Sequence, residues 1–215
     1  MPIEVHKNIE PAGELGIWKI EEDESFFLQQ LHLTVEEQQQ LAAIKGRKRI
    51  EWLAVRHLLH QMSGREIRGA VLKDEFGKPH LENSDWHISI SHSHEMAAAI
   101  AAPAPVGVDI QFLVEKIARI AHKFMRPEEM ESLEAASALE HLHVYWGAKE
   151  ALYKAYGRKK LDFKEHIFIR PFSFSLKTGG CTGSVKKGKS QKHFSIFYEK
   201  KGDFILVWAV EKRNV

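Results

Sequence analysis

Helix-like and strand-like patterns follow one another in the same order twice along this chain. Residues 34–62 carry the apolar spacing of helices, and residues 86–111 then alternate or run apolar in the manner of strands. A second round begins with helical patterns that end near residue 157, and further strand-like stretches follow them. Helices and strands that are segregated in this way predict an α+β fold.

The break between the two rounds lies at a proline-rich junction. Pro103 and Pro105 stand between two strand-like stretches, and proline interrupts the hydrogen-bonded ladder of a strand. We therefore expect two similar halves, residues 1–105 and residues 106–215. The sequence contains no evident repeat, so the similarity is expected in the order of the elements.

Specific residues mark where the helices begin and end. Thr34 precedes a helical pattern, and Glu37 lies three residues after Thr34, as in a capping box. Gly46 interrupts this pattern, and a second one runs over residues 47–62. Pro127 is suited to the first turn of a further helix. The expected strands are 14–20, 86–91, 96–102, 106–111, 172–176, 193–198 and 204–210.

The charge balance and the cysteine count narrow the class of protein. The chain has 31 Lys and Arg against 29 Asp and Glu, a net charge of +2. This small excess argues against a nucleic-acid binder but suits a local site for an anionic ligand. Cys181 is the only cysteine, so no internal disulfide is possible. The N-terminal residues have no apolar signal core and no apolar run is long enough to cross a bilayer, so we expect a cytoplasmic protein that binds neither nucleic acid nor membrane.

Residues 183–190, GSVKKGKS, satisfy the spacing of a phosphate-binding loop. Such a loop works between a strand and a helix whose N-terminal amides hold the phosphate. Here the pattern leads into HFSIFY, residues 193–198, which alternates like a strand. We therefore expect a basic hairpin tip and no phosphate loop.

Three histidines lie close together in the first half: His87, His92 and His94. Histidine nitrogens bind zinc, and a zinc site that activates water uses three protein ligands and an open position. The sequence has no HExxH motif and no thiol beside this cluster. A zinc-dependent hydrolase that uses these histidines is kept as an alternative.

The stretch WGAKEALYKAYG, residues 146–157, has good helix formers and ends at a glycine. Glu150 and Lys154 share one side of this helix with Trp146, because successive members are four residues apart. An exposed ion pair is the simplest interpretation, but a helix covered on both sides would place Glu150 in a cleft. The opposite stripe is apolar and comprises Tyr145, Ala148, Leu152 and Ala155.

An acid also interrupts an apolar strand. Asp109 lies within VGVDIQ, and a buried carboxylate without a partner is costly. Asp109 and Glu150 could converge on a hard cation, since magnesium uses few carboxylates together with waters and substrate phosphates. Basic groups that could bind the remaining phosphate charge are Arg56, Lys78 and His92.

A series of short motifs occurs in an order that is typical of one enzyme superfamily. The motifs are A-V-R at 54–56, F-G-K-P at 76–79, I-S-H-S at 90–93, V-G-V-D at 106–109 and W-G-A-K-E-A-L-Y-K at 146–154. With these motifs the chain resembles the 4′-phosphopantetheinyl transferase superfamily, in its long, two-halved, surfactin-synthetase-activating type. The match covers most of the chain, and the last two motifs correspond to the superfamily's signature pair.

The resemblance implies a pseudo-twofold pair of α/β halves with the active site between them. Residues 1–105 would bind coenzyme A, and residues 106–215 would bind magnesium and carry the catalytic groups. The implied reaction moves the 4′-phosphopantetheine arm of coenzyme A to a serine of an acyl or peptidyl carrier protein, and it releases adenosine 3′,5′-bisphosphate. Such a holo-carrier-protein synthase would act as a monomer in fatty-acid or secondary-metabolite biosynthesis.

The resemblance also implies roles for individual residues. Asp109 and Glu150 correspond to magnesium ligands, and Glu150 and Lys154 to catalytic residues. Gln111 stands where many members have an acid. An amide oxygen can still bind a hard cation, so Gln111 is kept as a third ligand. The implied contacts to coenzyme A are Arg56, Lys78, Ser91 and His92.

A third interpretation is a module that binds a nucleotide or a carrier protein without catalysis. Gln111 would then mark a decayed metal site. A turnover assay separates this module from the transferase, and metal analysis separates the transferase from the zinc hydrolase.

Overall fold

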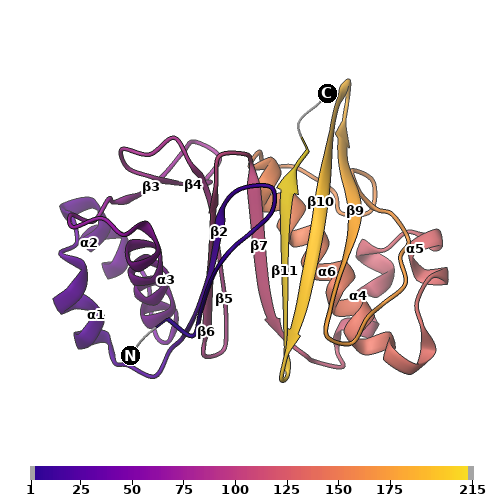
Figure 1. The fold of residues 1–215 in the computed structure, drawn as a ribbon, viewed down its shortest axis with the longest axis horizontal. Helices are drawn as coiled ribbons and strands as arrows, with labels where there is room; N and C mark the ends of the chain where they lie inside the picture. Colours follow the sequence, from indigo (N-terminus) through magenta and orange to yellow (C-terminus); the bar gives the residue numbers. More distant parts are fainter. Residues whose placement is uncertain (1–2, 213–215) are drawn as a thin grey trace. The chain divides into compact units, whose positions relative to one another are not determined.

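The computed structural model describes residues 3–212, and the chain divides into two compact units. These units are residues 1–103 and 104–215, a division close to the boundary expected after residue 105. Each unit contains an antiparallel sheet and a set of helices (Figure 1), so the expected α+β class is confirmed. The twofold relation between the halves stays a prediction.

The first unit is built on a six-stranded sheet. Its strands are β1 (Val5–Asn8), β2 (Glu14–Lys19), β3 (Val71–Lys73), β4 (Pro79–Leu81), β5 (His87–Ser93) and β6 (Met96–Ala102). They lie in the order β1-β2-β6-β5-β4-β3. In the central hairpin, His87 pairs with Ala102 and Ser93 with Met96. The predicted strands at 14–20, 86–91 and 96–102 are therefore confirmed, whereas β1, β3 and β4 were not predicted.

The helices of the first unit are α1 (Glu24–Leu31), α2 (Val35–Ala42) and α3 (Lys48–Ser63). The Thr34 hydroxyl accepts a hydrogen bond from the Glu37 amide, and the Glu37 carboxylate accepts one from the Thr34 amide. The predicted capping box is thereby confirmed. α3 packs against β2 and β6, and Leu58 and Ala97 are fully buried in this core. Burial of this apolar side holds the helix on the sheet.

The second unit has a five-stranded sheet. Its strands are β7 (Val106–Phe112), β8 (Ile167–Ile169), β9 (Thr178–Lys187), β10 (Ser190–Lys201) and β11 (Phe204–Glu211). They lie in the order β7-β11-β10-β9-β8, and all neighbouring pairs are antiparallel. The strands predicted over residues 106–111, 193–198 and 204–210 are confirmed within β7, β10 and β11.

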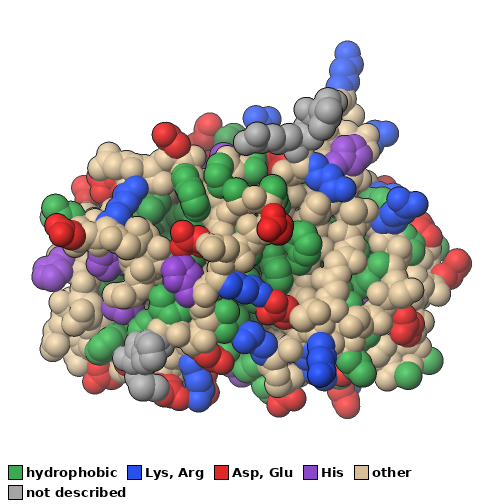
Figure 2. Space-filling model, viewed as in Figure 1, with side chains coloured by type: hydrophobic (Ala, Val, Ile, Leu, Met, Phe, Trp, Pro, Cys, Tyr) green, Lys and Arg blue, Asp and Glu red, His purple; other side chains and the backbone are tan. Residues whose placement is uncertain are grey.

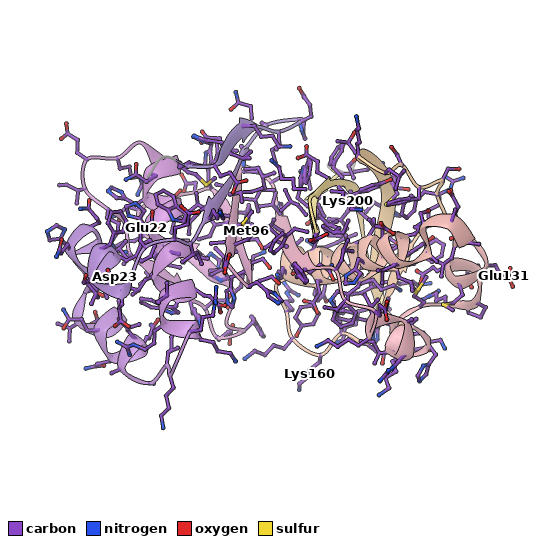
Figure 3. The ribbon with its side chains drawn as sticks, turned by 90° about the horizontal axis from the view of Figure 1, so that it is seen from below. Glu22, Asp23, Met96, Glu131, Lys160 and Lys200 are labelled. Atoms are coloured by element: carbon purple, nitrogen blue, oxygen red, sulfur yellow. The ribbon has the colours of Figure 1, made fainter. Side chains whose placement is uncertain are left out.

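The helices of the second unit are α4 (Ile117–Phe124), α5 (Pro127–Glu131) and α6 (Ala138–Tyr156). α6 lies across one face of the sheet, next to β7 and β11 (Figure 1). Tyr145 and Leu152 are fully buried in the core beneath it, so the predicted apolar stripe is confirmed. Glu131, at the end of α5, and Lys160, in the loop after α6, lie at the surface of this unit (Figure 3).

β7 and α6 approach each other closely at Gly107. A Cβ atom on this residue would lie 1.9 Å from the carbonyl oxygen of Ala151. Only glycine fits such a close approach of strand and helix. Because alternate residues of a strand share a face, the same contact directs Asp109 and Gln111 toward α6.

The prediction of a strand over residues 172–176 is wrong, because this segment has no regular secondary structure. The Phe174 amide donates to the Glu134 carboxylate, and the Ser175 amide donates to the Tyr198 hydroxyl. Side chains therefore take the hydrogen bonds that a neighbouring strand would make.

The prediction of a basic hairpin tip is confirmed. β9 and β10 join through a tight turn in which Gly188 has a φ of 60°, a left-handed conformation that glycine adopts easily. Strand follows the turn directly, so no helix N-terminus is present to hold a phosphate. The Lys187 ammonium donates to the Lys160 carbonyl at 2.6 Å and ties the hairpin to the loop after α6.

Acidic and basic side chains are interspersed on the face that Figure 2 shows. This mixture agrees with the net charge of +2. None of the described helices is both long and apolar enough to cross a membrane.

Candidate functional site

Asp109 and Lys154 form an ion pair between β7 and α6. The Lys154 ammonium donates to Asp109 Oδ1 at 2.8 Å and to the Val108 carbonyl at 2.9 Å. Asp109 is 8% exposed and Lys154 is half-buried. The acid that interrupts an apolar strand thus has a charged partner, which offsets the cost of burying it.

Glu150 lies one helical turn before Lys154 on α6, and its side chain is partly buried. Burial raises the pKa of Glu150, the negative charge of Asp109 raises it further, and Lys154 opposes both effects. The two carboxylates are therefore close enough to repel each other. A divalent cation between them would relieve this repulsion and the desolvation together.

Gln111 also points from β7 toward α6. Its amide nitrogen donates to the His143 carbonyl at 2.9 Å and to Asp109 Oδ2 at 3.3 Å. Its amide oxygen accepts a hydrogen bond from His143 Nδ1 at 2.8 Å. Burial lowers the pKa of the His143 ring. The structure thus gathers Asp109, Gln111, Glu150 and Lys154, all four predicted from the sequence, around one strand–helix contact.

His143 was not singled out from the sequence. It lies seven residues before Glu150, and seven residues are close to two turns of an α-helix, so both side chains leave the same side of α6. That spacing was the available signal.

The donor set on β7 and α6 suits a hard cation such as magnesium. Asp109 and Glu150 offer carboxylate oxygens from neighbouring elements, and magnesium completes its shell with waters and substrate phosphates. Over residues 3–212, no three or more histidine, cysteine, aspartate or glutamate side chains are grouped so as to hold a metal. Asp109 and Glu150 therefore suit a metal site whose remaining positions are filled by water and substrate. They do not suit a site in which protein side chains supply every ligand.

The first unit presents Lys78, Ser91 and His92 from a turn and a strand. The Asp74 carboxylate accepts a hydrogen bond from the Lys78 amide at 2.8 Å and so shapes the turn before β4. His92 Nδ1 lies 2.9 Å from Glu51 Oε2, and the His92 side chain is 41% exposed. Ser91 is buried, and alternation along β5 turns it to the opposite face of the sheet from His92.

Arg56 does not reach the surface of the first unit. It is 2% exposed, and its Nε lies 3.3 Å from the carboxylate of Glu37, which also pairs with Arg68. The guanidinium stacks over the Trp52 ring, and burial lowers the pKa of Arg56 to about 10. These contacts assign Arg56 to the core, in contrast to the coenzyme A contact expected from the A-V-R motif.

The histidines of the first unit are too widely spaced for one metal ion. His87 and His92 are five residues apart on β5, which is about 16 Å along an extended strand. His94 lies beyond the strand, with a φ of 54°. The zinc-dependent hydrolase is therefore not favoured.

A cavity of about 230 Å³ opens in the first unit, away from the residues considered so far. It reaches the C-terminal end of α3 at Leu59 and Met62, whereas His92 contacts Glu51 near the start of that helix. None of the residues implicated by the motifs lines this cavity. Its walls also include Glu14, Ser63, Arg65, Leu81, Ser84, Trp86, Ile88 and Ala101.

A family match lies in the second unit. Residues 105–209 match the model of the 4′-phosphopantetheinyl transferase superfamily. The chain is 34% identical over 89 residues to the 4′-phosphopantetheinyl transferase gsp of Aneurinibacillus migulanus, a match that covers 40% of this chain and 37% of that protein. It is 29% identical over 110 residues to the 4′-phosphopantetheinyl transferase psf-1 of Bacillus pumilus, a match that covers 48% of this chain and 47% of that protein. It is 30% identical over 88 residues to a 4′-phosphopantetheinyl transferase of Bacillus subtilis, which covers 39% of each. The chain thus spans less than half the length of these relatives.

Proposed function

We propose that this chain is a 4′-phosphopantetheinyl transferase, on the premise that residues 105–209 match the model of that superfamily. It transfers the 4′-phosphopantetheine arm of coenzyme A to a serine of an acyl or peptidyl carrier protein, with magnesium bound. The cytoplasmic location and the monomeric state stay predictions.

One observation supports the proposal most directly: Lys154, one helical turn after Glu150 on α6, lies 2.8 Å from Asp109 on β7, so a strand and a helix bring carboxylates to one place. Under this proposal Asp109 and Glu150 hold the magnesium ion. When bound, magnesium neutralises charge on the pyrophosphate of coenzyme A and makes its β-phosphate more electrophilic. The protein side chains position the reacting groups and transfer the proton.

In the proposed reaction the serine oxygen forms a bond to the β-phosphorus of coenzyme A. The bond from that phosphorus to the bridging oxygen breaks, and adenosine 3′,5′-bisphosphate leaves with the electron pair. The serine proton passes to the Glu150 carboxylate, which acts as the general base. Lys154, already next to Asp109, contributes a positive charge close to the transferred phosphate.

Binding of the nucleotide end of coenzyme A is proposed for Lys78 and His92; Ser91 is left out because it is buried and points to the opposite face of β5 from His92. Lys78 adjoins a turn shaped by Asp74, and His92 stands at the end of β5 with an exposed ring edge. A lysine ammonium and a histidine ring are suitable donors to phosphate oxygens. Arg56 is left out of this set because it is buried against Glu37.

The proposal is tested by incubating the purified chain with coenzyme A, magnesium and a panel of apo carrier proteins from fatty-acid, polyketide and peptide systems. Intact mass spectrometry would report which carriers gain the phosphopantetheine arm, and omission of magnesium serves as the control. Transfer to at least one carrier is expected. A chain that binds coenzyme A and a carrier but transfers nothing would instead be a non-catalytic binding module.

A further inference from the structure

The Gln111 amide is held with its nitrogen, and not its oxygen, toward Asp109. The nitrogen lies 2.9 Å from the His143 carbonyl and 3.3 Å from Asp109 Oδ2. A carbonyl oxygen and a carboxylate oxygen can only accept, so a donor must occupy this position. The amide oxygen consequently faces the other way, toward His143 Nδ1 at 2.8 Å.

The Gln111 amide oxygen can only accept, so its hydrogen bond with His143 places the ring proton on Nδ1. Nε2 then carries the lone pair and accepts a hydrogen bond from the Val114 amide at 3.0 Å; the Val114 carbonyl also lies 3.2 Å from Nε2. A continuous series of hydrogen bonds therefore leads from the Val114 amide through His143 and Gln111 to the Asp109 carboxylate.

The surface of α6 is shaped to admit this amide. Gly147 lies one turn after His143, and a Cβ atom on it would come within 2.7 Å of Gln111 Nε2 and 2.6 Å of Val207 Cγ2. Any larger residue at position 147 would displace the amide or the helix. The absence of a side chain at Gly147 thus leaves the space that the Gln111 amide fills.

From these contacts we propose that Gln111 and His143 are positioning residues that hold the Asp109 carboxylate in place for the metal, and that Gln111 is not itself a ligand. The inference rests on the proposed function and corrects the third ligand expected from the sequence. To bind a cation, the Gln111 oxygen would have to leave His143 and the amide would have to turn its nitrogen away from the His143 carbonyl. Partners of this kind, which orient a ligand without touching the metal, commonly tune metal affinity.

The proposal is tested on the full chain with Mn²⁺ as a paramagnetic probe, whose binding is followed by electron paramagnetic resonance. Three variants form a matched set. His143→Leu removes the Nδ1 donor, and His143→Asn restores a side-chain amide donor near the same place. His141→Leu makes the same change two residues away, where both ring nitrogens lack a hydrogen-bond partner among the described residues.

The expected result is a roughly 10-fold weaker affinity for Mn²⁺ in His143→Leu, in line with the loss of other outer partners of metal ligands. His143→Asn should recover most of the affinity, and His141→Leu should bind like the unaltered chain. In transfer assays, the Mg²⁺ concentration for half-maximal rate should rise in His143→Leu while the rate at saturating Mg²⁺ changes less. Equal affinities in all three variants would overturn the proposal.

A glutamate at position 111 separates the positioning role from direct ligation. Gln111→Glu replaces a donor by an acceptor that faces the His143 carbonyl and Asp109, so Mn²⁺ binding should weaken or stay unchanged. Tighter binding of Mn²⁺ by this variant would show that residue 111 reaches the ion, and the positioning role would be wrong.

One measurement on the unaltered chain covers the case in which the His143 variants do not fold. The Nδ1 proton of His143 should give a protected downfield NMR resonance, and this resonance should disappear in Gln111→Met. Its absence from the unaltered chain would overturn the hydrogen-bond chain. Failure of transfer to every carrier, with the variant pattern in Mn²⁺ affinity intact, would count against the proposed transferase and leave the positioning role standing.

Discussion

Lys149 and Glu129 form an ion pair in which both side chains are fully buried and the two charged groups are 2.9 Å apart. The Lys149 ammonium also donates to the carbonyls of Phe163 and Ile167, at 3.0 and 2.9 Å. All three of its donors are therefore used. The pair ties the chain that follows α6 back onto the helix that carries Glu150.

Lys149→Met should destabilise the protein by about 3 to 5 kcal/mol, because it leaves the Glu129 charge buried without its partner. Urea unfolding followed by circular dichroism measures this loss. The double variant Lys149→Met with Glu129→Leu should recover part of the stability, since no unpaired charge remains. A single variant as stable as the unaltered chain would show that the pair is not a structural support.

Glu150→Gln should abolish transfer and leave the fold intact. The change is nearly isosteric but removes both the negative charge for magnesium and the base for the serine proton. Transfer is measured at saturating Mg²⁺ by intact mass of the carrier, and thermal melting serves as the control for folding. Near-normal turnover in a folded variant would remove Glu150 from the centre of the mechanism.

Lys78→Ala and His92→Ala should weaken the binding of coenzyme A, each by about 1.5 to 3 kcal/mol, the range for a hydrogen bond to a charged group. Isothermal calorimetry with coenzyme A measures the affinity. Lys177→Ala, which removes an exposed lysine of the second unit that the proposal does not use, is the matched control. Unchanged affinity in both Lys78→Ala and His92→Ala would move the nucleotide site elsewhere.

Arg56→Met distinguishes the two roles considered for Arg56. The buried pair with Glu37 predicts a loss of about 3 to 5 kcal/mol in the free energy of unfolding, with little change in coenzyme A affinity of the folded protein. Denaturation and calorimetry on the same preparation decide between the two roles. Normal stability with weakened binding of coenzyme A would restore the role that the A-V-R motif implies.

His141 should make the protein sensitive to acid. Its ring packs among Tyr145, Phe172 and Phe174, and burial lowers the pKa of His141 below its ordinary value of 6.5. A lowered pKa in the folded state means that the contribution to stability is complete above pH 6.5 and is lost as the pH falls toward the folded value. His141→Leu should therefore lose less stability between neutral pH and pH 5. Thermal melts across this range check the slope, and parallel slopes for both proteins would contradict the assignment.

Local patterns predicted a large part of the fold. The capping box at Thr34, the alternating strand at residues 86–91 and the apolar stripe of α6 are all confirmed, because each depends on residues close in sequence. The segment 172–176 alternates equally well but forms no strand. Its amides bond to Glu134 and Tyr198, which lie far away in the sequence, and no local pattern contains that information.

The sequence was sufficient to predict which charged residues form the candidate site. It was not sufficient to predict how the side chains around them are oriented. Strand alternation placed Asp109 and Gln111 on one face, and helix spacing placed Glu150 and Lys154 on one stripe. The direction of the Gln111 amide depends on His143 and on the space left by Gly147. Neither follows from the motif, which is why an acid at position 111 looks favourable from the sequence and unfavourable from the contacts.

The close approach at Gly107 also determines which positions a mutational screen would find intolerant. Gly107 bears no functional group, yet an added methyl would meet the Ala151 carbonyl and push α6 away from β7. The Lys154 ammonium would then lose its reach to Asp109, and the carboxylates would move apart. A mutational scan for loss of activity would therefore find position 107 as intolerant of substitution as a metal ligand. The distance between α6 and β7 would be the property that selection for binding other metal ions changes.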